Sequence, residues 1–302
     1  MNSKKIKGNI MLLLTAVIWG AAFVAQDKGM DYISPFTFNG IRMILGGITL
    51  LPVIMVTQKT QKPVSDANST FRLSRQEITG GIFCGIALFA ASSFQQFGMA
   101  LYDSNAATAG KGGFLSALYV VFVPVLGLFL KKKVPASAWI SVVIALLGMY
   151  LLCIKGTSKM SVADLLLCIC AVFFAVHILV IDRYSPSVNG IKLSAVQFFV
   201  CGGLSVICAL IFDPVQSLNS IISAAVPILY TGCLSSGVAY TLQVVAQKYT
   251  SPSAASLILS LESVFAALFG AVFGERLSAQ ELLGCALVFA AVIISQIKYS
   301  DK

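Results

Sequence analysis

The sequence predicts an all-α polytopic membrane protein with ten transmembrane helices, arranged as two inverted five-helix repeats. Three observations support this: the composition, a series of apolar segments of membrane-spanning length, and an internal repeat. Of the 302 residues, 58% are hydrophobic and 11% are charged, whereas about a quarter of an average soluble domain is charged. The net charge of +9 comes without a basic patch interleaved with aromatic residues. We therefore expect a lipid bilayer around the chain and no nucleic-acid partner.

The apolar segments define the expected helices, because about 20 helical residues cross a hydrocarbon core of about 30 Å. The first segment follows a short basic tail, but its length and the spans after it favour a transmembrane helix over a signal peptide. Only residues 58–76 form a long polar connection. The expected helices cover residues 8–26, 35–57, 77–100, 105–130, 135–154, 162–181, 191–212, 223–247, 252–273 and 279–297.

The basic residues predict the orientation. If the N-terminus is cytoplasmic, most lysines and arginines between the spans fall on the cytoplasmic side, and the outside carries only Lys28, Lys155, Lys159 and Arg276. The positive-inside rule then places both termini in the cytoplasm of a cell (plasma or inner) membrane. The cysteines all lie in apolar segments without CxxC spacing, so we expect no disulfide, metal or cofactor.

The internal repeat predicts the architecture. A shift of about 155 residues aligns 16–28 with 171–183, and shifts of about 147 and 143 align later segments. These alignments make Gln96 equivalent to Gln243, and Tyr119 equivalent to Glu262. Because five helices is an odd number, the second copy enters the membrane the other way up. We expect a first repeat over residues 1–156 and a second over 157–302.

Two stretches carry a resemblance to a known family. They are AVIWGAAFV in the first expected helix and the run from Ser251 to Ser295, in which small residues precede LE and a small apolar run ends in GERL. With the inverted repeat, they make the chain similar to the EamA-type ten-helix members of the drug/metabolite transporter superfamily. The chain departs from the family at Ser263, where proline is common. The resemblance implies secondary transport of small metabolites or drugs, often outward.

Glu262 is the candidate that most needs a function. It is the only charge within residues 251–273 and lies near the middle of that span. An acidic residue at the centre of a membrane helix costs about 3 kcal/mol and is by default a functional hypothesis. The alternative is a protonated or hydrogen-bonded carboxyl that only joins helices. If the repeat-equivalent helices face each other, Tyr119 meets Glu262 in one cavity.

The fourth expected helix carries a polar stripe with helical spacing, which we expect to face away from lipid. Lys111 borders the stripe, and either snorkels to the headgroups or pairs with Glu262 or a substrate carboxylate. Arg42, at similar depth in the second helix, is interpreted as a snorkelling or bundle-locking charge. The stripe contains Asn105, Thr108, Gly112, Ser116 and Tyr119.

Four further side chains are candidate substrate contacts, each with a packing alternative. His177, the only histidine, is either a hydrogen-bond partner between helices or a proton relay. Trp19, with its equivalent Phe174, offers an aromatic cavity wall or ordinary packing. The equivalent amides Gln96 and Gln243 either contact substrate or join helices.

Two patterns are interpreted as structural. Gly81 and Gly85 have GxxxG spacing, which allows close helix approach. Serines along residues 253–263 form a ridge that we expect to be a packing seam, because Glu262 lies about 100° around the helix from Ser263.

The expected function is alternating access at a central cavity by a monomer or weak homodimer, with protons as a candidate coupling ion. An acid, a base, amides and a phenol would suit a zwitterion such as an amino acid, or an amine. The alternatives are a lipid-handling flippase or a non-transporting scaffold. An intramembrane enzyme is disfavoured, since the sequence has no HExxH motif or paired nucleophile and base.

Overall fold

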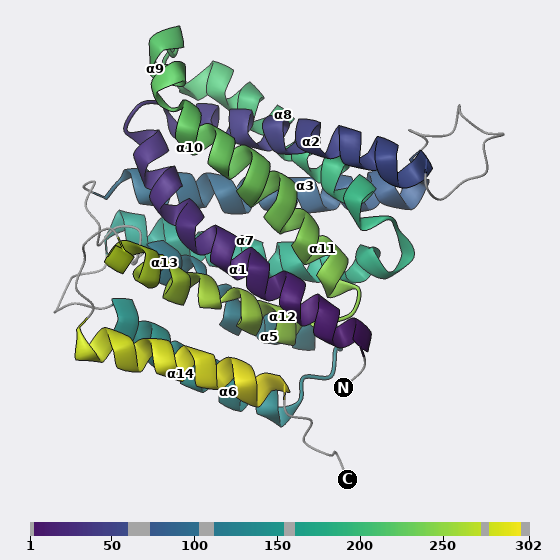
Figure 1. Cartoon of the computed structure of the whole chain (residues 1–302), viewed down its shortest axis with the longest axis vertical. Coiled ribbons are helices and arrows are strands. Elements are labelled where there is room, and N and C mark those ends of the chain that lie inside the picture. Colours follow the sequence, from purple (N-terminus) through teal and green to yellow (C-terminus); the bar gives the residue numbers. More distant parts are fainter. Residues whose placement is uncertain (1–2, 60–72, 103–111, 154–160, 273–277, 297–302) are drawn as a thin grey trace.

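The computed structural model describes residues 3–59, 73–102, 112–153, 161–272 and 278–296, which form helices joined by short connections (Figure 1). Within these ranges nine helical segments are long and apolar enough to cross a membrane, and a shorter apolar helix lies at the fifth expected position. The chain is therefore an all-α polytopic membrane protein. The arrangement as ten helices in two inverted repeats stays a prediction.

The first half contains α1 (Ser3–Met30), α2 (Pro35–Lys59), α3 (Arg75–Ala100), the span Gly112–Phe129 ending in α5 (Tyr119–Phe129), and α6 (Ala136–Cys153). The expected start of the fourth helix, including Asn105 and Lys111, lies outside the described residues.

The second half begins with α7 (Val162–Tyr184), the short turn η2 (Ser185–Ser187) and α8 (Gly190–Phe212), followed by a small extra helix, α9 (Leu218–Ser223). The eighth expected helix is a composite of α10 (Ala225–Leu229), η3 (Tyr230–Tyr240) and α11 (Thr241–Gln247). The ninth is divided into α12 (Pro252–Leu259) and α13 (Leu261–Val272), and α14 (Ala279–Gln296) is the last.

Sequence signals at the helix starts explain where several spans begin. Ser74 and Glu77 form a capping box at α3, in which each side chain bonds the backbone N–H of the other residue. Ser161 and Asp164 form the same arrangement at α7. Such boxes satisfy backbone donors that the helix itself leaves free. The Tyr102 hydroxyl also bonds Asp164, which joins the end of α3 to the start of the antiparallel α7.

The helices pack in a small number of close pairs. The most extensive are α6 with α14, α3 with α7, α2 with α8, α3 with α8, and α1 with α13. Along the other side of α1 run η3 and α11, and η3 also packs on α2. The pair α6 and α14 lies at one edge of the bundle (Figure 1). This arrangement leaves α1, α2, α3, α5, α7, η3 and α13 around a common centre.

Glycines allow α3 to approach α8, as their GxxxG spacing predicts. A Cβ atom placed on Gly81 would lie 2.5 Å from the Val196 Cβ atom. On Gly85 it would lie 2.6 Å from the Val200 Cβ atom and 2.8 Å from the Gln197 carbonyl oxygen. Lipid tails give helices no hydrophobic drive to associate, so this close contact supplies much of the packing energy.

The fourth and ninth spans are both irregular in the middle. In the fourth, a turn at residues 117–118 precedes α5, and Val120 N–H bonds the Ala117 carbonyl. In the ninth, Ser260 separates α12 from α13, and Ser263 N–H bonds the Ser260 carbonyl at 3.2 Å. These i→i+3 bonds tighten the helix locally. Both irregularities come directly before the residues that the repeat alignment makes equivalent, Tyr119 and Glu262.

The serine ridge is satisfied within its own helix. The hydroxyls of Ser256, Ser260 and Ser263 each donate to the carbonyl three residues earlier, at 2.8–3.0 Å. Ser260 and Ser263 are fully buried. Hydroxyl bonds of this kind compete with the backbone ladder and accompany helix bending, which fits the irregularity at Ser260.

We expect Gly85→Ala to destabilise the protein by about 1–3 kcal/mol, because the new methyl group has no room against α8. Gly203→Ala, on α8, is the matched control, since a Cβ atom there meets nothing within 4 Å. Alanine is intrinsically the better helix former by about 1 kcal/mol, so the control should be neutral or stabilised. Thermal unfolding of both variants in detergent is the measurement, and equal effects would contradict the close approach.

Candidate functional site

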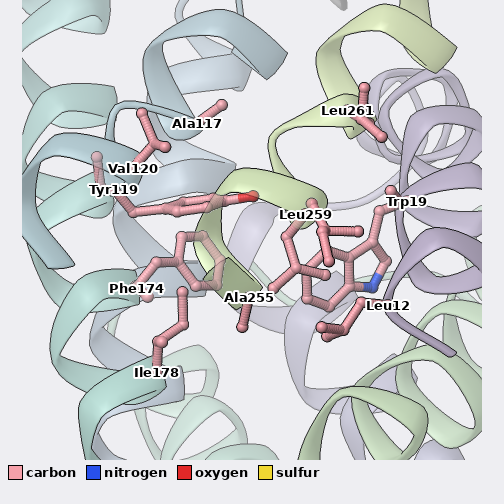
Figure 2. Packing of buried hydrophobic residues seen from close by; sticks show 14 of the residues in the cluster. Leu12, Trp19, Ala117, Tyr119, Val120, Phe174, Ile178, Ala255, Leu259 and Leu261 are labelled. Atoms are coloured by element: carbon pink, nitrogen blue, oxygen red, sulfur yellow. The ribbon is translucent and has the colours of Figure 1, made fainter. Parts of the chain in front are cut away.

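A cavity at the centre of the bundle is lined by side chains from seven elements. Its walls are aromatic: Trp19 and Phe23 come from α1, Tyr119 from α5, Phe174 from α7 and Tyr240 from η3. Trp19 and Tyr240 pack with ring centroids 4.5 Å apart, and Tyr119 meets Phe174 edge to face at 6.3 Å. In Figure 2 the Tyr119 ring lies beside Phe174, and its hydroxyl points toward the α12 and α13 helix.

The polar part of the lining includes two groups that are charged in water, Arg42 and Glu262, together with Gln26, Gln95 and Ser235. Glu262 is 4% exposed and Tyr119 is 3% exposed. The Tyr119 hydroxyl donates a hydrogen bond of 2.9 Å to Glu262 Oε1. The structure thus brings together the phenol and the carboxyl that the repeat alignment makes equivalent. Ser263 is not among the described lining residues, so the serine ridge and Glu262 face different ways.

Local helix structure positions Glu262. It lies in the first turn of α13, directly after the irregularity at Ser260. The start of a helix carries partial positive charge, which stabilises a nearby anion. The carboxyl therefore has two internal compensations in the apolar bundle, the Tyr119 hydroxyl and the start of its own helix.

Arg42 corrects our prediction from sequence. A snorkelling side chain would reach the headgroups, but Arg42 is 1% exposed and lines the central cavity. Its Nε donates to Asn39 Oδ1 at 3.0 Å, and its Cζ lies 5.8 Å from the centre of the Phe38 ring. Within the described part of the chain, Arg42 Nη2 has no hydrogen-bond partner. The guanidinium is held in place from one side and left open on the other.

Asn39 connects Arg42 to the rest of the bundle. Its Nδ2 donates to Ser92 Oγ at 2.9 Å on α3 and to Ser205 Oγ at 2.8 Å on α8. Both serines and Asn39 are fully buried. The network fixes the guanidinium at the junction of three helices.

The segment η3 lines the cavity with a wide helical turn. It is a π-helix, in which carbonyls bond amides five residues along instead of four. Two carbonyls in this segment accept bonds from α1: Ser235 O from Trp19 Nε1 at 3.3 Å, and Ala239 O from Thr15 Oγ1 at 3.0 Å. π-Helical turns are frequent at functional sites. Here the turn brings Ser235 and Tyr240 to the cavity.

Three predicted site residues are buried but are not among the described lining of this cavity. His177 Nε2 pairs with Gln197 Oε1 at 3.0 Å, and its ring meets Tyr240 edge to face. Gln243 donates to Gln247 at 3.1 Å. Gln96 has no side-chain partner among the residues that the structure describes. Lys111 and Asn105 lie outside those residues, so a meeting of Lys111 with Glu262 stays a prediction.

The cavity is closed in this conformation. About 20 Å³ is available to the centres of water molecules, which accommodates about one or two waters. A second cavity, with about 270 Å³ available in the same sense, lies where α5, α7 and the start of α12 meet; Lys132, Lys133, Ser251 and Ser253 line it. Binding any metabolite at the centre therefore requires the helices around it to move apart.

We expect Asn39→Ala to destabilise the protein by about 2 kcal/mol, because it leaves buried Arg42 Nε and two serine hydroxyls without a partner. Asn9→Ala is the control: Asn9 bonds Gln296 and Thr250 in a partly buried position at the end of the bundle, and its loss should cost less than about 1 kcal/mol. Thermal unfolding compares the two variants. An Asn39→Ala protein as stable as the control would mean that the network does not hold Arg42.

Comparison with known proteins agrees with this architecture. Over 96% of both chains, the structure resembles a crystal structure titled only as a protein, with a TM-score of 0.74 and 17% sequence identity, which concerns the fold alone. An uncharacterized transporter of Archaeoglobus fulgidus is 31% identical over 297 residues, covering 98% of this chain and 87% of the relative. The uncharacterized transporter YoaV of Bacillus subtilis is 20% identical over 98% of this chain and 99% of its own.

The family assignment rests on a match along nearly the whole chain. The model of the EamA-like transporter family matches residues 6–154 and 161–296. The chain therefore belongs to the EamA-like transporter family and is a membrane transporter.

Proposed function

We propose that the protein is a secondary transporter that moves small metabolites or drugs by alternating access at the central cavity, in the outward direction that the family resemblance implies. Amino acids, related zwitterions and amines are the candidate substrates. The observation that carries the proposal is the hydrogen bond between Tyr119 and Glu262. It joins equivalent positions of the two proposed repeats at the bottom of a closed cavity, where inverted-repeat transporters bind their substrates.

The helix pairs support the two inverted repeats. Exchanging the first half for the second turns the pair α3 and α7 into the pairing of η3 and α11 with α1. It turns α1 and α13 into α7 and α5, and α3 and α8 into η3 and α2. The pairs α2 with α8 and α6 with α14 are each exchanged with themselves. All of these pairs are in contact. The two separate stretches that match the family also support a division near residue 157.

The irregular turns give the proposed motion a structural basis. Helices that are interrupted at the substrate site are typical of secondary transporters, and hinges are often a few residues at the ends of elements. The turns before Tyr119 and Glu262 are equivalent in the two repeats. Rotation there would separate the phenol from the carboxyl and enlarge the closed cavity.

The second cavity supports a route to the centre. Tyr119, Val123 and Gly127 are spaced four residues apart, so they share one face of α5. Tyr119 lines the central cavity, whereas Val123 and Gly127 line the second one. On α7, Phe174 and Leu179 are divided between the two cavities in the same way. The second cavity is the proposed vestibule, and the side chains between the cavities are the proposed gate.

Contacts at the helix ends support cytoplasmic termini in a cell membrane. Asn9 at the start of α1 bonds Gln296 at the end of α14 and Thr250 before α12. Lysines gather at this end, among them Lys7, Lys132 and Lys248, as the positive-inside rule requires of the cytoplasmic side.

The orientation predicts the behaviour of reporter fusions. A C-terminal fusion to a fluorescent protein that matures only in the cytoplasm should fluoresce, because ten crossings return the chain to its starting side. A fusion truncated after residue 159, in the proposed outside connection, should instead activate a reporter that needs the cell exterior. The opposite pattern would reverse the proposed topology.

We expect Glu262→Gln to abolish substrate accumulation driven by a pH gradient in proteoliposomes, because the amide cannot take up and release a proton while substrate crosses. Tyr119→Phe, which keeps the carboxyl, is the matched control and should retain the pH drive with altered affinity.

Substrates for this assay come from thermal-shift panels of amino acids, amines, nucleosides and sugars. A ligand at 100 times its Kd should stabilise the protein by about 2.7 kcal/mol. Undiminished gradient-driven accumulation by Glu262→Gln would remove the carboxyl from the coupling mechanism.

A further inference from the structure

We infer that the central cavity is a two-point site for a zwitterion, in which Arg42 binds a carboxylate, Glu262 binds an ammonium, and the aromatic walls hold an apolar side chain. The inference rests on the proposed transport function and narrows its substrate class. It replaces Lys111, the basic partner expected from sequence, with a residue from the opposite side of the cavity.

Arg42 supplies the anion-binding point. A guanidinium stays protonated in proteins and carries five N–H donors in a planar fork. Here the side chain is 1% exposed, with Nε on Asn39 and Nη2 without a partner among the described residues. A buried charge is strongly unfavourable unless it is paired. A carboxylate that entered the cavity would accept two parallel N–H bonds from such a fork.

Glu262 supplies the cation-binding point. The Tyr119 hydroxyl bonds Oε1, which leaves Oε2 to accept a bond from an ammonium group. The aromatic lining favours a cation at the same place, because the faces of Trp19, Tyr119 and Tyr240 carry negative potential. Tyr240, within electrostatic range of both charged residues, places an aromatic face between the two binding points.

The two residues are held apart, which favours a ligand with both charges. No ion pair joins Arg42 to Glu262 in the described part of the chain. Arg42 is tied through Asn39 to α3 and α8, and Glu262 is tied to α5 through Tyr119. A simple amine would leave the guanidinium without an anion, and a simple acid would leave the carboxylate without a cation. Only a zwitterion neutralises both points at once.

The test uses ligands that differ by one charged group. L-Phenylalanine, 2-phenylethylamine and 3-phenylpropionate share a side chain and carry both charges, the ammonium alone or the carboxylate alone. Leucine, isoamylamine and 4-methylpentanoate form a second set with a smaller apolar group. Affinities for the full-length protein in nanodiscs are measured by isothermal titration. In at least one set, the amino acid should bind at least tenfold more tightly than either single-charge analogue.

Two variants identify the binding points through a change in preference. Arg42→Gln should lose at least tenfold in affinity for the amino acid while keeping its affinity for the amine. Glu262→Gln should lose the same factor while keeping affinity for the acid. A merely unfolded or loosened protein would lose all three ligands together. If Arg42→Gln fails to fold, the comparison of wild type with Glu262→Gln still decides the question.

Three results would overturn the inference. The wild type could bind an amine or an acid as tightly as the matching amino acid, or both variants could weaken all three ligands equally. It could also bind none of the six while it binds and transports a sugar or a nucleoside; the zwitterion site would then be wrong and the proposed transport function would stand. If no compound of the wider panels is bound or moved, both proposals fail.

Discussion

Hydrocarbon offers no hydrogen-bond partner, and this constraint explains most of the structure. Every polar group inside the bundle has to find a partner within the protein or face a cavity. The capping boxes at α3 and α7, the serine hydroxyls of the ninth span and the bonds from α1 to the carbonyls of η3 all satisfy groups in this way. The exceptions are concentrated around the centre, where Arg42 Nη2 and Gln26 Oε1 have no partner among the described residues.

Close packing and the polar centre depend on each other. Glycines on α3 bring α8 near enough for Asn39 to bond serines on both helices. That network fixes Arg42 on one side of the cavity, while the irregular ninth span fixes Glu262 on the other. A site that holds opposite charges apart is costly without a ligand, which is a reason for the protein to close to a volume of about 20 Å³ between transport steps.

Much of the architecture was predictable because it follows from local patterns. Apolar segments of membrane length gave the spans, and GxxxG spacing gave the close approach of α3. The repeat alignment predicted the meeting of Tyr119 with Glu262, since equivalent helices of an inverted repeat lie opposite each other. Arg42 carried the same signal as Glu262, a charge deep in a span, but the snorkelling interpretation was wrong: the length of an arginine side chain allows both outcomes, and only its neighbours decide between them.

The sequence by itself determined the class of protein, the positions of the spans and the deep ionisable residues, because these depend on composition and on periodicity along a single helix. The tertiary structure alone decided which side chains share the cavity. Tyr240 and Ser235 reach it through the π-helical turn of η3, and Arg42 through its bond to Asn39. His177, Gln96 and Gln243, equally polar in sequence, are not among the described residues of that lining. The rotation of each helix about its axis is set by contacts between helices far apart in the chain, which no local pattern contains.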